Sequence, residues 1–287
     1  MITSALRERV ESVLGRRVLN LTRTHGGDIN DAFELTLEDG QRVFLKTNAD
    51  APPGLFAAEA RGLGLLAAAE ALRVPKVLAV GDEAPSFLLL EFIHSAKPGR
   101  HFDDDLGRGL AAVHRAGLPY FGLDHDNFIA TLRQSNRRRE SWAEFYRAQR
   151  LEPQLRLALT SGRAPRSLAR PFERLFASLA ERVGPAEPPA RLHGDLWGGN
   201  LHIDETGAPV LIDPALYGGH REVDLAMMQL FGGFSARVFA AYAEAFSLAP
   251  GHAERVPLYQ LYPLLVHVNL FGGSYVARVR DIVEGLA

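Results

Sequence analysis

The chain has 287 residues, with 32 Lys and Arg against 34 Asp and Glu, and this near balance argues against a nucleic-acid partner. It contains no cysteine, which excludes disulfides and thiol catalysis and favours a cytoplasmic location. Arg7 and Glu8 carry charge where a signal peptide needs an apolar core. The longest uncharged run, 261–277, contains Pro263 and several polar residues, so we expect no membrane span.

Three strands are predicted in the amino-terminal third, at residues 18–24, 32–37 and 42–46. Asp39-Gly40 joins the second and third strands and is typical of a tight type I′ hairpin. The segment between the first two strands contains Gly26 and Gly27, whose backbone N–H groups could approach a phosphate closely. Two adjacent glycines also suit an ordinary hairpin turn.

Lys46 ends the third predicted strand, and a helix is predicted next, at residues 55–72, with Glu59 in its first turns. In kinases a strand lysine contacts the α/β-phosphates and is oriented by a helix glutamate. Either residue alone would usually be a solvated surface group. As a pair on adjacent elements, Lys46 and Glu59 predict a nucleotide-binding function.

Residues 1–93 therefore form a strand-rich lobe, and residues 94–287 a mostly helical one. Apolar spacing predicts helices at 101–116, 142–159, 167–183 and 234–246. The predicted fold class is α+β, with a small antiparallel sheet in the first lobe and a larger helical second lobe.

The most specific motif is His193-Gly194-Asp195-Leu196-Trp197-Gly198-Gly199-Asn200, followed by an apolar run that ends at Asp213. It keeps the spacing of the kinase patterns H-R-D-L-x-x-x-N and D-F-G. A carboxylate about 4 Å from a phosphate oxygen is repelled by roughly 4 kcal/mol at an effective dielectric of 20, so Asp213 needs a cation. Mg²⁺ suits Asp213 and Asn200, while Asp195 is left to accept the proton of an attacking hydroxyl. His-Gly-Asp alone would more often be a loop turn.

Several segments together resemble the fructosamine kinase (ketosamine-3-kinase) family, within the wider aminoglycoside-phosphotransferase-like group. They are residues 26–30, 193–200, 212–215, 217–226, 230–234 and 258–265. The resemblance implies a bilobal, protein-kinase-like fold. It also implies ATP- and Mg²⁺-dependent phosphorylation of the sugar 3-hydroxyl of ketosamines, the fructosamine or ribulosamine adducts of amines or protein lysines, which initiates deglycation.

Carried over residue by residue, the family pattern makes Asp195 the proton acceptor and gives Asn200 and Asp213 to the metal. It places the backbone of Glu91, Phe92 and Ile93 against adenine, in the hinge at 91–93. His193 and Asp224 are expected to support the site. Asp224 could brace the catalytic loop or cap the helix predicted at 225–230.

Trp197, His267 and Asn269 are candidate substrate contacts. Trp197 could wall the acceptor site or anchor the core. His267 could equally be a satisfied core histidine, although the resemblance places its helix near the acceptor cleft. Two further functions remain open from the residues: an aminoglycoside- or choline-type kinase of the same fold, and a non-catalytic nucleotide-binding regulator.

Overall fold

The computed structural model describes residues 2–24 and 30–286, which form two compact units. The first unit comprises Met1–Phe102 and Gly199–Pro214, and the second comprises Asp103–Gly198 and Ala215–Ala287. The segment that carries Asn200 and Asp213 thus belongs to the amino-terminal unit. The domain boundary and the hinge at 91–93 remain predictions from the sequence.

The first unit is built on a five-stranded sheet in which every neighbouring pair is antiparallel. Its spatial order is β1 (Val18–Thr24), β2 (Asp31–Leu37), β3 (Arg42–Asn48), β5 (Ser86–Glu91) and β4 (Val77–Gly81). The predicted antiparallel sheet is confirmed, and β3 pairs with β5 so that Lys46 lies opposite Leu88.

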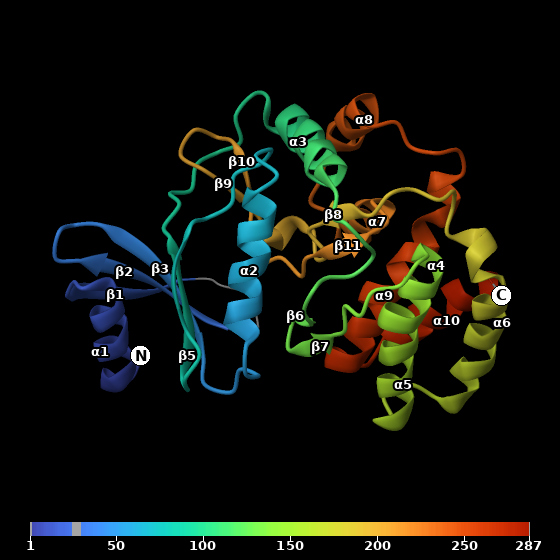
Figure 1. Cartoon of the computed structure of the whole chain (residues 1–287), viewed down its shortest axis with the longest axis horizontal. Helices are drawn as coiled ribbons and strands as arrows, with labels where there is room; N and C mark the ends of the chain where they lie inside the picture. Colours follow the sequence, from blue (N-terminus) through green and yellow to red (C-terminus); the bar gives the residue numbers. More distant parts are fainter. Residues whose placement is uncertain (1, 25–29, 287) are drawn as a thin grey trace. The chain divides into compact units, whose positions relative to one another are not determined.

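Two helices cover opposite faces of this sheet (Figure 1). Because side chains alternate along a strand, Phe87 and Leu89 pack with α1 (Ser4–Leu14), whereas Leu88 and Leu90 pack with α2 (Leu55–Ala67). The predicted helix at 55–72 is therefore real but ends earlier. The chain leaves helical geometry at Glu70, whose φ is +51°.

A two-stranded hairpin, β9 (Leu201–Ile203) and β10 (Pro209–Leu211), completes the first unit. Arg73 ties it to the sheet by donating to Asp204 in the hairpin turn at 2.8 Å and to Glu91 at the end of β5 at 2.7 Å. Its carbonyl accepts the backbone N–H of Leu211 at 2.9 Å.

The second unit is mostly helical, as predicted. Its helices are α3 (Phe102–Ala116), α4 (Trp142–Phe145), α5 (Glu152–Thr160), α6 (Ala169–Arg182), α7 (Glu222–Phe231), α8 (Ala236–Ala245), α9 (His252–Phe271) and α10 (Tyr275–Leu286). A π-helical turn, η1 (Tyr146–Leu151), joins α4 to α5, and short 3₁₀ turns lie at η2 (Arg166–Leu168) and η3 (Gly198–Asn200). Short antiparallel pairs join β6 (Asn127–Ile129) to β7 (Leu132–Gln134), and β8 (Ala190–Leu192) to β11 (Tyr217–Gly219).

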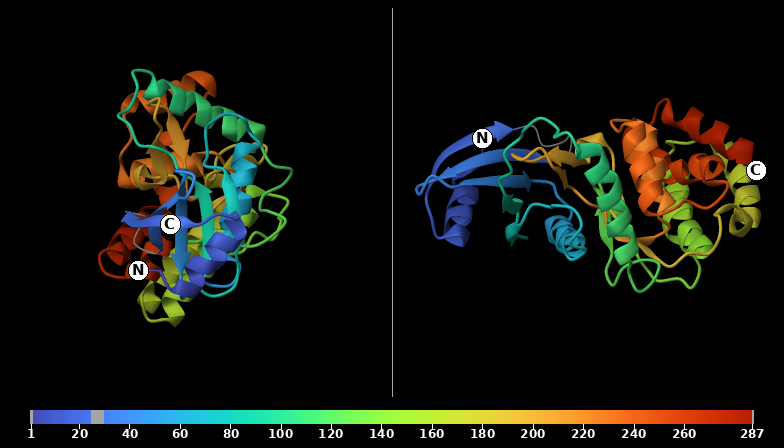
Figure 2. Two further views of the ribbon diagram at one scale, coloured as in Figure 1. Left: turned by 90° about the vertical axis from the view of Figure 1, so that its left-hand side faces the viewer. Right: turned by 90° about the horizontal axis from the view of Figure 1, so that it is seen from above.

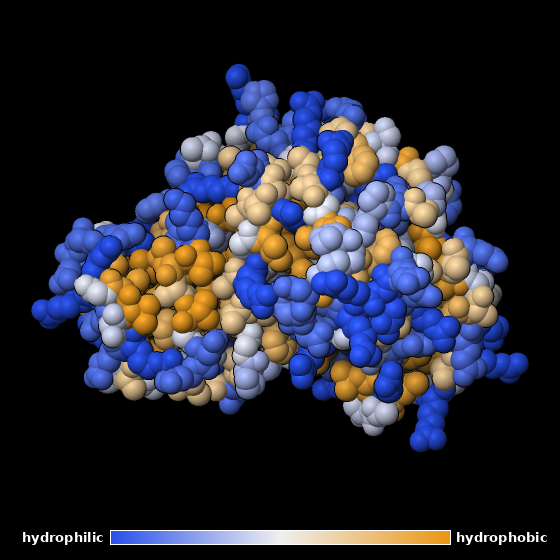
Figure 3. All heavy atoms as spheres, in the orientation of Figure 1, coloured by the Kyte–Doolittle hydropathy of each residue, from blue (hydrophilic) through white to orange (hydrophobic). Residues whose placement is uncertain are grey.

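The core of the second unit gathers around α9, which is largely buried and packs along α10 at the carboxyl end of the chain (Figure 2). In the part of the chain that the structure describes, no helix combines the length and apolarity needed to cross a bilayer. Hydrophilic side chains cover much of the face in Figure 3, and apolar ones gather over the sheet of the first unit.

Candidate active site

Lys46 is buried near the end of β3, two residues before Asn48, and binds two carboxylates of the first unit. Its Nζ donates to Glu59 Oε1 and Oε2 at 2.8 and 3.0 Å, and to Asp213 Oδ1 at 2.8 Å. Glu59 lies on α2, the helix in which it was predicted to lie. The predicted pairing of strand lysine and helix glutamate is therefore present, and Asp213 joins it.

The charges of this cluster do not cancel, because one ammonium group faces two carboxylates. Burial opposes the charged lysine, but the two acids outweigh that effect and raise the pKa of Lys46. Burial also raises the pKa of Glu59, to about 7, although Lys46 partly offsets the shift. The Asp213 backbone has a φ of +56°, a left-handed conformation that non-glycine residues rarely adopt and that often marks functional sites.

Asn200 and Asp213 lie at the same end of the β9–β10 hairpin. Asn200 directly precedes β9, and its carbonyl accepts the N–H of Ile212, the residue before Asp213, at 3.1 Å. A carboxylate and a neutral amide are oxygen donors of the kind that Mg²⁺ takes. No group of three or more His, Asp or Glu within residues 2–24 and 30–286 could hold a metal ion. Asn200 and Asp213 are two oxygen donors at one end of the hairpin, the number that Mg²⁺ commonly takes from a protein when phosphate oxygens and water complete its coordination.

The predicted adenine-binding segment lies at the end of β5. The carboxylate of Glu91 accepts from Arg73 and from the Lys76 N–H, Phe92 lies under the guanidinium of Arg42 at 4.0 Å, and the Ile93 carbonyl lies 3.2 Å from His202 Nε2. The side chains of Glu91 and Phe92 are thus occupied by structural contacts, whereas at Ile93 the contact is made by the backbone carbonyl. Gly26 and Gly27 lie outside the described residues.

The catalytic-loop candidates belong to the second unit, where Asp224 holds their backbone. Its buried carboxylate accepts the N–H of His193 at 2.7 Å and that of Gly194 at 2.9 Å, directly before Asp195. α7 begins at Glu222, so Asp224 lies inside the helix rather than capping it. Burial alone would raise the pKa of Asp224, but the hydrogen bond from His114 and the backbone donors lower it.

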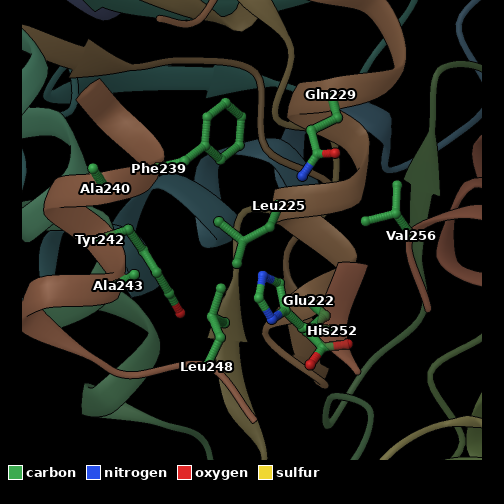
Figure 4. A pocket seen from close by; sticks show the side chains of 10 residues that line it. All are labelled: Glu222, Leu225, Gln229, Phe239, Ala240, Tyr242, Ala243, Leu248, His252 and Val256. Carbon is green, nitrogen blue, oxygen red and sulfur yellow. The ribbon is translucent and has the colours of Figure 1, made fainter. Parts of the chain in front are cut away.

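His114 is a buried contributor to this loop that the sequence reasoning missed. Its Nε2 donates to Asp224 at 3.1 Å, and its Nδ1 lies 2.8 Å from the hydroxyl of Tyr242. In the sequence, this role could have been suspected because His114 lies on the apolar face of the helix predicted at 101–116. Tyr242 also lines a cavity of about 250 Å³ between α7, α8 and the start of α9 (Figure 4).

A second, small cavity opens beside Asp195. It is lined by Ile129, Gly194, Asp195, Val223, Met227, Tyr262, Pro263, Val266 and His267. His267 Nδ1 lies 2.7 Å from the carbonyl of Pro263 and must donate to it, and burial lowers the pKa of His267. The neutral ring therefore keeps Nε2 as a hydrogen-bond acceptor on the cavity wall.

Trp197 and Asn269 lie in different surroundings. Trp197 is 40% exposed, so it is not a core anchor, and its ring contacts Phe231, which in turn contacts His267. Asn269 is buried and donates to the carbonyl and side chain of Gln154 on α5 at 2.9 and 2.7 Å. It is not among the residues lining the cavity beside Asp195, so its predicted substrate contact gains no support.

Comparisons with known proteins show the family and the fold of this chain. The fructosamine kinase family model matches residues 3–287. A protein of Enterococcus faecium named as a probable ketoamine kinase is 39% identical over 261 residues, which are 90% of this chain and 92% of that protein. A crystal structure described as a candidate fructosamine-3-kinase, from Thermobifida fusca, has 38% identity and a TM-score of 0.90 and covers 99% of each chain. An amicoumacin kinase, solved in complex with AMP-PNP, Ca²⁺ and Ami, shares the fold at a TM-score of 0.60 and 15% identity, over 99% of this chain and 94% of that one.

The antiparallel sheet with its buried Lys46–Glu59 pair, the helical second unit and these matches define a kinase of the protein-kinase-like fold that uses an alcohol as its acceptor. Within that class, the chain belongs to the fructosamine kinase family.

Proposed function

We propose that this protein uses ATP and Mg²⁺ to phosphorylate the 3-hydroxyl of the sugar in ketosamines, in the cytoplasm, as the first step of their deglycation. The acceptor is a fructosamine or ribulosamine adduct of a free amine or of a protein lysine. The observation that carries the proposal is the family match from residue 3 to residue 287.

Lys46 is proposed to contact the α/β-phosphates, with Glu59 holding its ammonium group in place. Support comes from the hydrogen bonds of 2.8 and 3.0 Å between them and from the burial of Lys46. The backbone of Glu91, Phe92 and Ile93 is proposed to bind adenine, and Gly26 and Gly27 to cover the phosphates.

Asn200 and Asp213 would hold the divalent cation, which, when bound, neutralises charge on the transferring phosphoryl group. The Ca²⁺ and AMP-PNP bound to the amicoumacin kinase support a nucleotide and a divalent metal in this fold. In the structure, Lys46 donates a hydrogen bond to Asp213 at 2.8 Å. If a cation were bound by that carboxylate, the ammonium group could donate to a phosphate oxygen instead.

Asp195 is proposed to accept the proton of the attacking sugar hydroxyl. Its place on the wall of the small cavity with His267 supports this role, since a substrate hydroxyl there could reach the carboxylate. Nε2 of His267 would accept a hydrogen bond from a neighbouring sugar hydroxyl. The exposed ring of Trp197 would contact the amine portion of the acceptor.

The direct test is mass spectrometry of a glycated lysine peptide after incubation with ATP and Mg²⁺. We expect one added phosphate, which NMR of the product should locate on the sugar 3-hydroxyl. Asp195→Asn should reduce kcat by about 10²- to 10⁴-fold, the range for a positioned general base, and still bind nucleotide. Asp281→Asn, an exposed change on α10, is the matched control.

An acceptor screen separates the remaining functions. Turnover of an aminoglycoside or of choline in preference to any ketosamine would contradict the proposed substrate. A thermal shift with ATP but no turnover of any acceptor would instead indicate a nucleotide-binding regulator. Full activity in Asp195→Asn would remove the proposed base.

A further inference from the structure

Arg150 is a fully buried arginine in the core of the second unit, and each of its hydrogen bonds goes to a neutral oxygen. Its Nη1 donates to the carbonyls of Ser135 and Gln149 at 2.7 and 2.9 Å, and its Nη2 donates to Asn136 Oδ1 at 2.7 Å. Nε has no hydrogen-bond partner within the described residues. The guanidinium is thus held in one orientation by three acceptors without charge.

Aromatic rings surround the guanidinium where a carboxylate would be expected. Its carbon lies 3.7 Å from the ring centre of Tyr217, 4.7 Å from that of Phe145 and 5.6 Å from that of Tyr262. Across residues 2–24 and 30–286, no Asp or Glu forms a salt bridge with it. Burying an unpaired charge is unfavourable, and an apolar side chain would pack here at lower cost. Stability alone therefore does not explain why a charged arginine is buried at position 150.

The backbone around Arg150 departs from regular geometry. Arg150 lies within the π-helical turn η1, between the α-helical segments α4 and α5. Single π-turns inside helices are rare and occur frequently at functional sites. Arg150 enters a core to which α4 contributes Trp142 and Phe145 and α5 contributes Leu155 and Ala158.

A chain of buried amides leads from Arg150 to the segment just after Asp213. Asn136, whose Oδ1 binds Arg150, donates through Nδ2 to Asn127 Oδ1 at 2.7 Å. Asn127 Nδ2 then donates to the carbonyl of Leu216 at 2.9 Å. Gln134 Nε2 donates to the same Asn127 oxygen and to the carbonyl of Ala215, at 2.8 and 3.1 Å.

Ala215 is in direct contact with the catalytic loop. Its N–H donates to the carbonyl of His193 at 3.0 Å, and its carbonyl lies so close to Gly194 that a Cβ there would approach it to 2.2 Å. Fixing the carbonyls of Ala215 and Leu216 therefore fixes the two residues that precede Asp195. The series of contacts from Arg150 to this loop lies entirely within the second unit.

We propose that Arg150 is a positioning residue for phosphoryl transfer. Through Asn136, Asn127 and Gln134 it holds the 215–216 backbone, and thereby sets the position of Asp195. The inference rests on the proposed role of Asp195 as the proton acceptor, but not on which alcohol is the substrate.

The first test compares Arg150→Met and Arg150→Lys with the wild type, at a temperature where all are folded. Misplacement of a catalytic group by about 1 Å can cost about 10²-fold, so we expect Arg150→Met to lower kcat by about 10- to 100-fold. The KM for ATP should stay within about twofold, since the nucleotide contacts lie in the first unit. Arg150→Lys should recover part of the loss, because an ammonium can still donate to Asn136 or Ser135.

Asn136→Asp and Leu155→Ala separate positioning from stability. The carboxylate at 136 could no longer donate to Asn127 or to the carbonyl of His125, so kcat should fall. The new ion pair with Arg150 should offset these lost hydrogen bonds, so we expect little change in the unfolding midpoint. Leu155, a buried apolar residue on α5, lies in the same core. Its truncation should lower the midpoint without lowering kcat more than about twofold. Wild-type kcat in folded Arg150→Met or in Asn136→Asp, or an equal loss in Leu155→Ala, would overturn the inference.

Amide hydrogen exchange gives a readout that needs no substrate. In Asn136→Asp, the amides of residues 193–195 and 215–217 should exchange faster than in the wild type, while those of the first unit stay unchanged. Unchanged exchange in both segments would overturn the positioning role. Failure of every ketosamine as acceptor would overturn the proposed substrate instead, and the kinetic series would then be measured with whichever alcohol the wild type phosphorylates.

Discussion

Lys46 and Asp213, 167 positions apart in the chain, form an ion pair with 2.8 Å between Nζ and Oδ1. The same ammonium group binds Glu59, so two carboxylates share one buried cation. Burial, with a smaller contribution from the nearby Asp213 carboxylate, raises the pKa of Glu59 to about 7. A cation bound beside Asp213, as proposed above, would relieve this imbalance of charge.

Lys46→Met tests the role of this ammonium group. Removing it leaves Glu59 and Asp213 without their partner and takes one positive charge from the proposed phosphate site. We expect kcat/KM for ATP to fall by at least about 10²-fold, which corresponds to about 2.7 kcal/mol of lost transition-state stabilisation. Steady-state kinetics with varied ATP measures this loss.

Lys97→Met is the matched control for that change, since Lys97 is exposed and lies in the same unit. It should leave kcat/KM within about twofold. A folded Lys46→Met protein with the kinetics of Lys97→Met would contradict the proposed phosphate contact.

Gly194→Ala tests the close approach of the catalytic loop to Ala215. Gly194 has a φ of +85°, and a Cβ there would lie 2.2 Å from the Ala215 carbonyl oxygen. Gly162 has a φ of +73° but nothing within 4 Å of its Cβ position. Gly162→Ala should therefore cost only the conformational strain, about 1–2 kcal/mol of unfolding free energy. Gly194→Ala should cost more and also lower kcat, as urea unfolding and turnover assays would measure. Equal losses in the two variants would show that the loop accommodates the methyl group.

The sequence alone could predict those parts of the site in which a residue type and its spacing carry the chemistry. Lys46 and Glu59 could be paired because strand, turn and helix follow each other closely. The antiparallel sheet could be predicted from the three strand-like runs and from the hairpin signal Asp39-Gly40. The partnership of Lys46 with Asp213 could not be derived in this way. It depends on the β9–β10 hairpin joining the first unit, which only the tertiary fold reveals.

Buried polar networks were the other feature that spacing could not predict. Arg150 sits in a run that reads as a regular amphipathic helix, and nothing in it marks a π-turn. Asn269 is the opposite case. The sequence suggested a substrate contact for this polar residue, but its side chain donates to the backbone carbonyl of Gln154. Hydrogen-bond partners distant in sequence decide such cases, and the periodicity of one helix contains no information about them.

Asp224→Asn should lower kcat, although the asparagine side chain has nearly the same shape as that of aspartate. The amide has one acceptor oxygen, so it can accept from either His193 or Gly194 but must turn its NH₂ group toward the other N–H. A buried donor left unpaired costs about 1–3 kcal/mol, which we expect as a loss of unfolding free energy. We expect kcat to fall about tenfold or more, because the loop before Asp195 loses one of its anchors. Wild-type kcat in a folded variant would show that the loop holds its position without Asp224.

Asp204→Asn should change the pH dependence of stability. Burial alone would raise the pKa of Asp204, but hydrogen bonds from Thr206, Arg73 and the Ala208 N–H lower it well below its usual value. Because the native state favours the ionised form, its contribution to stability is fully present above the unfolded pKa of about 3.9 and is lost as pH falls toward the lower native pKa.

The measurement is urea unfolding of Asp204→Asn and of the wild type at pH 7, 4 and 2.5. At pH 7 the variant should be less stable by about 1.5–3 kcal/mol, the range for hydrogen bonds to a charged group. The difference should shrink between pH 4 and pH 2.5, because Asp204 of the unfolded wild-type chain then takes up a proton, whereas the native carboxylate does not. Asp82→Asn, an exposed change in the same unit, should show no such trend. A stability difference for Asp204→Asn that stays constant from pH 7 to 2.5 would mean that the charge of Asp204 does not hold the β9–β10 turn, and that Arg73 fixes the hairpin through Leu211 and Glu91 instead.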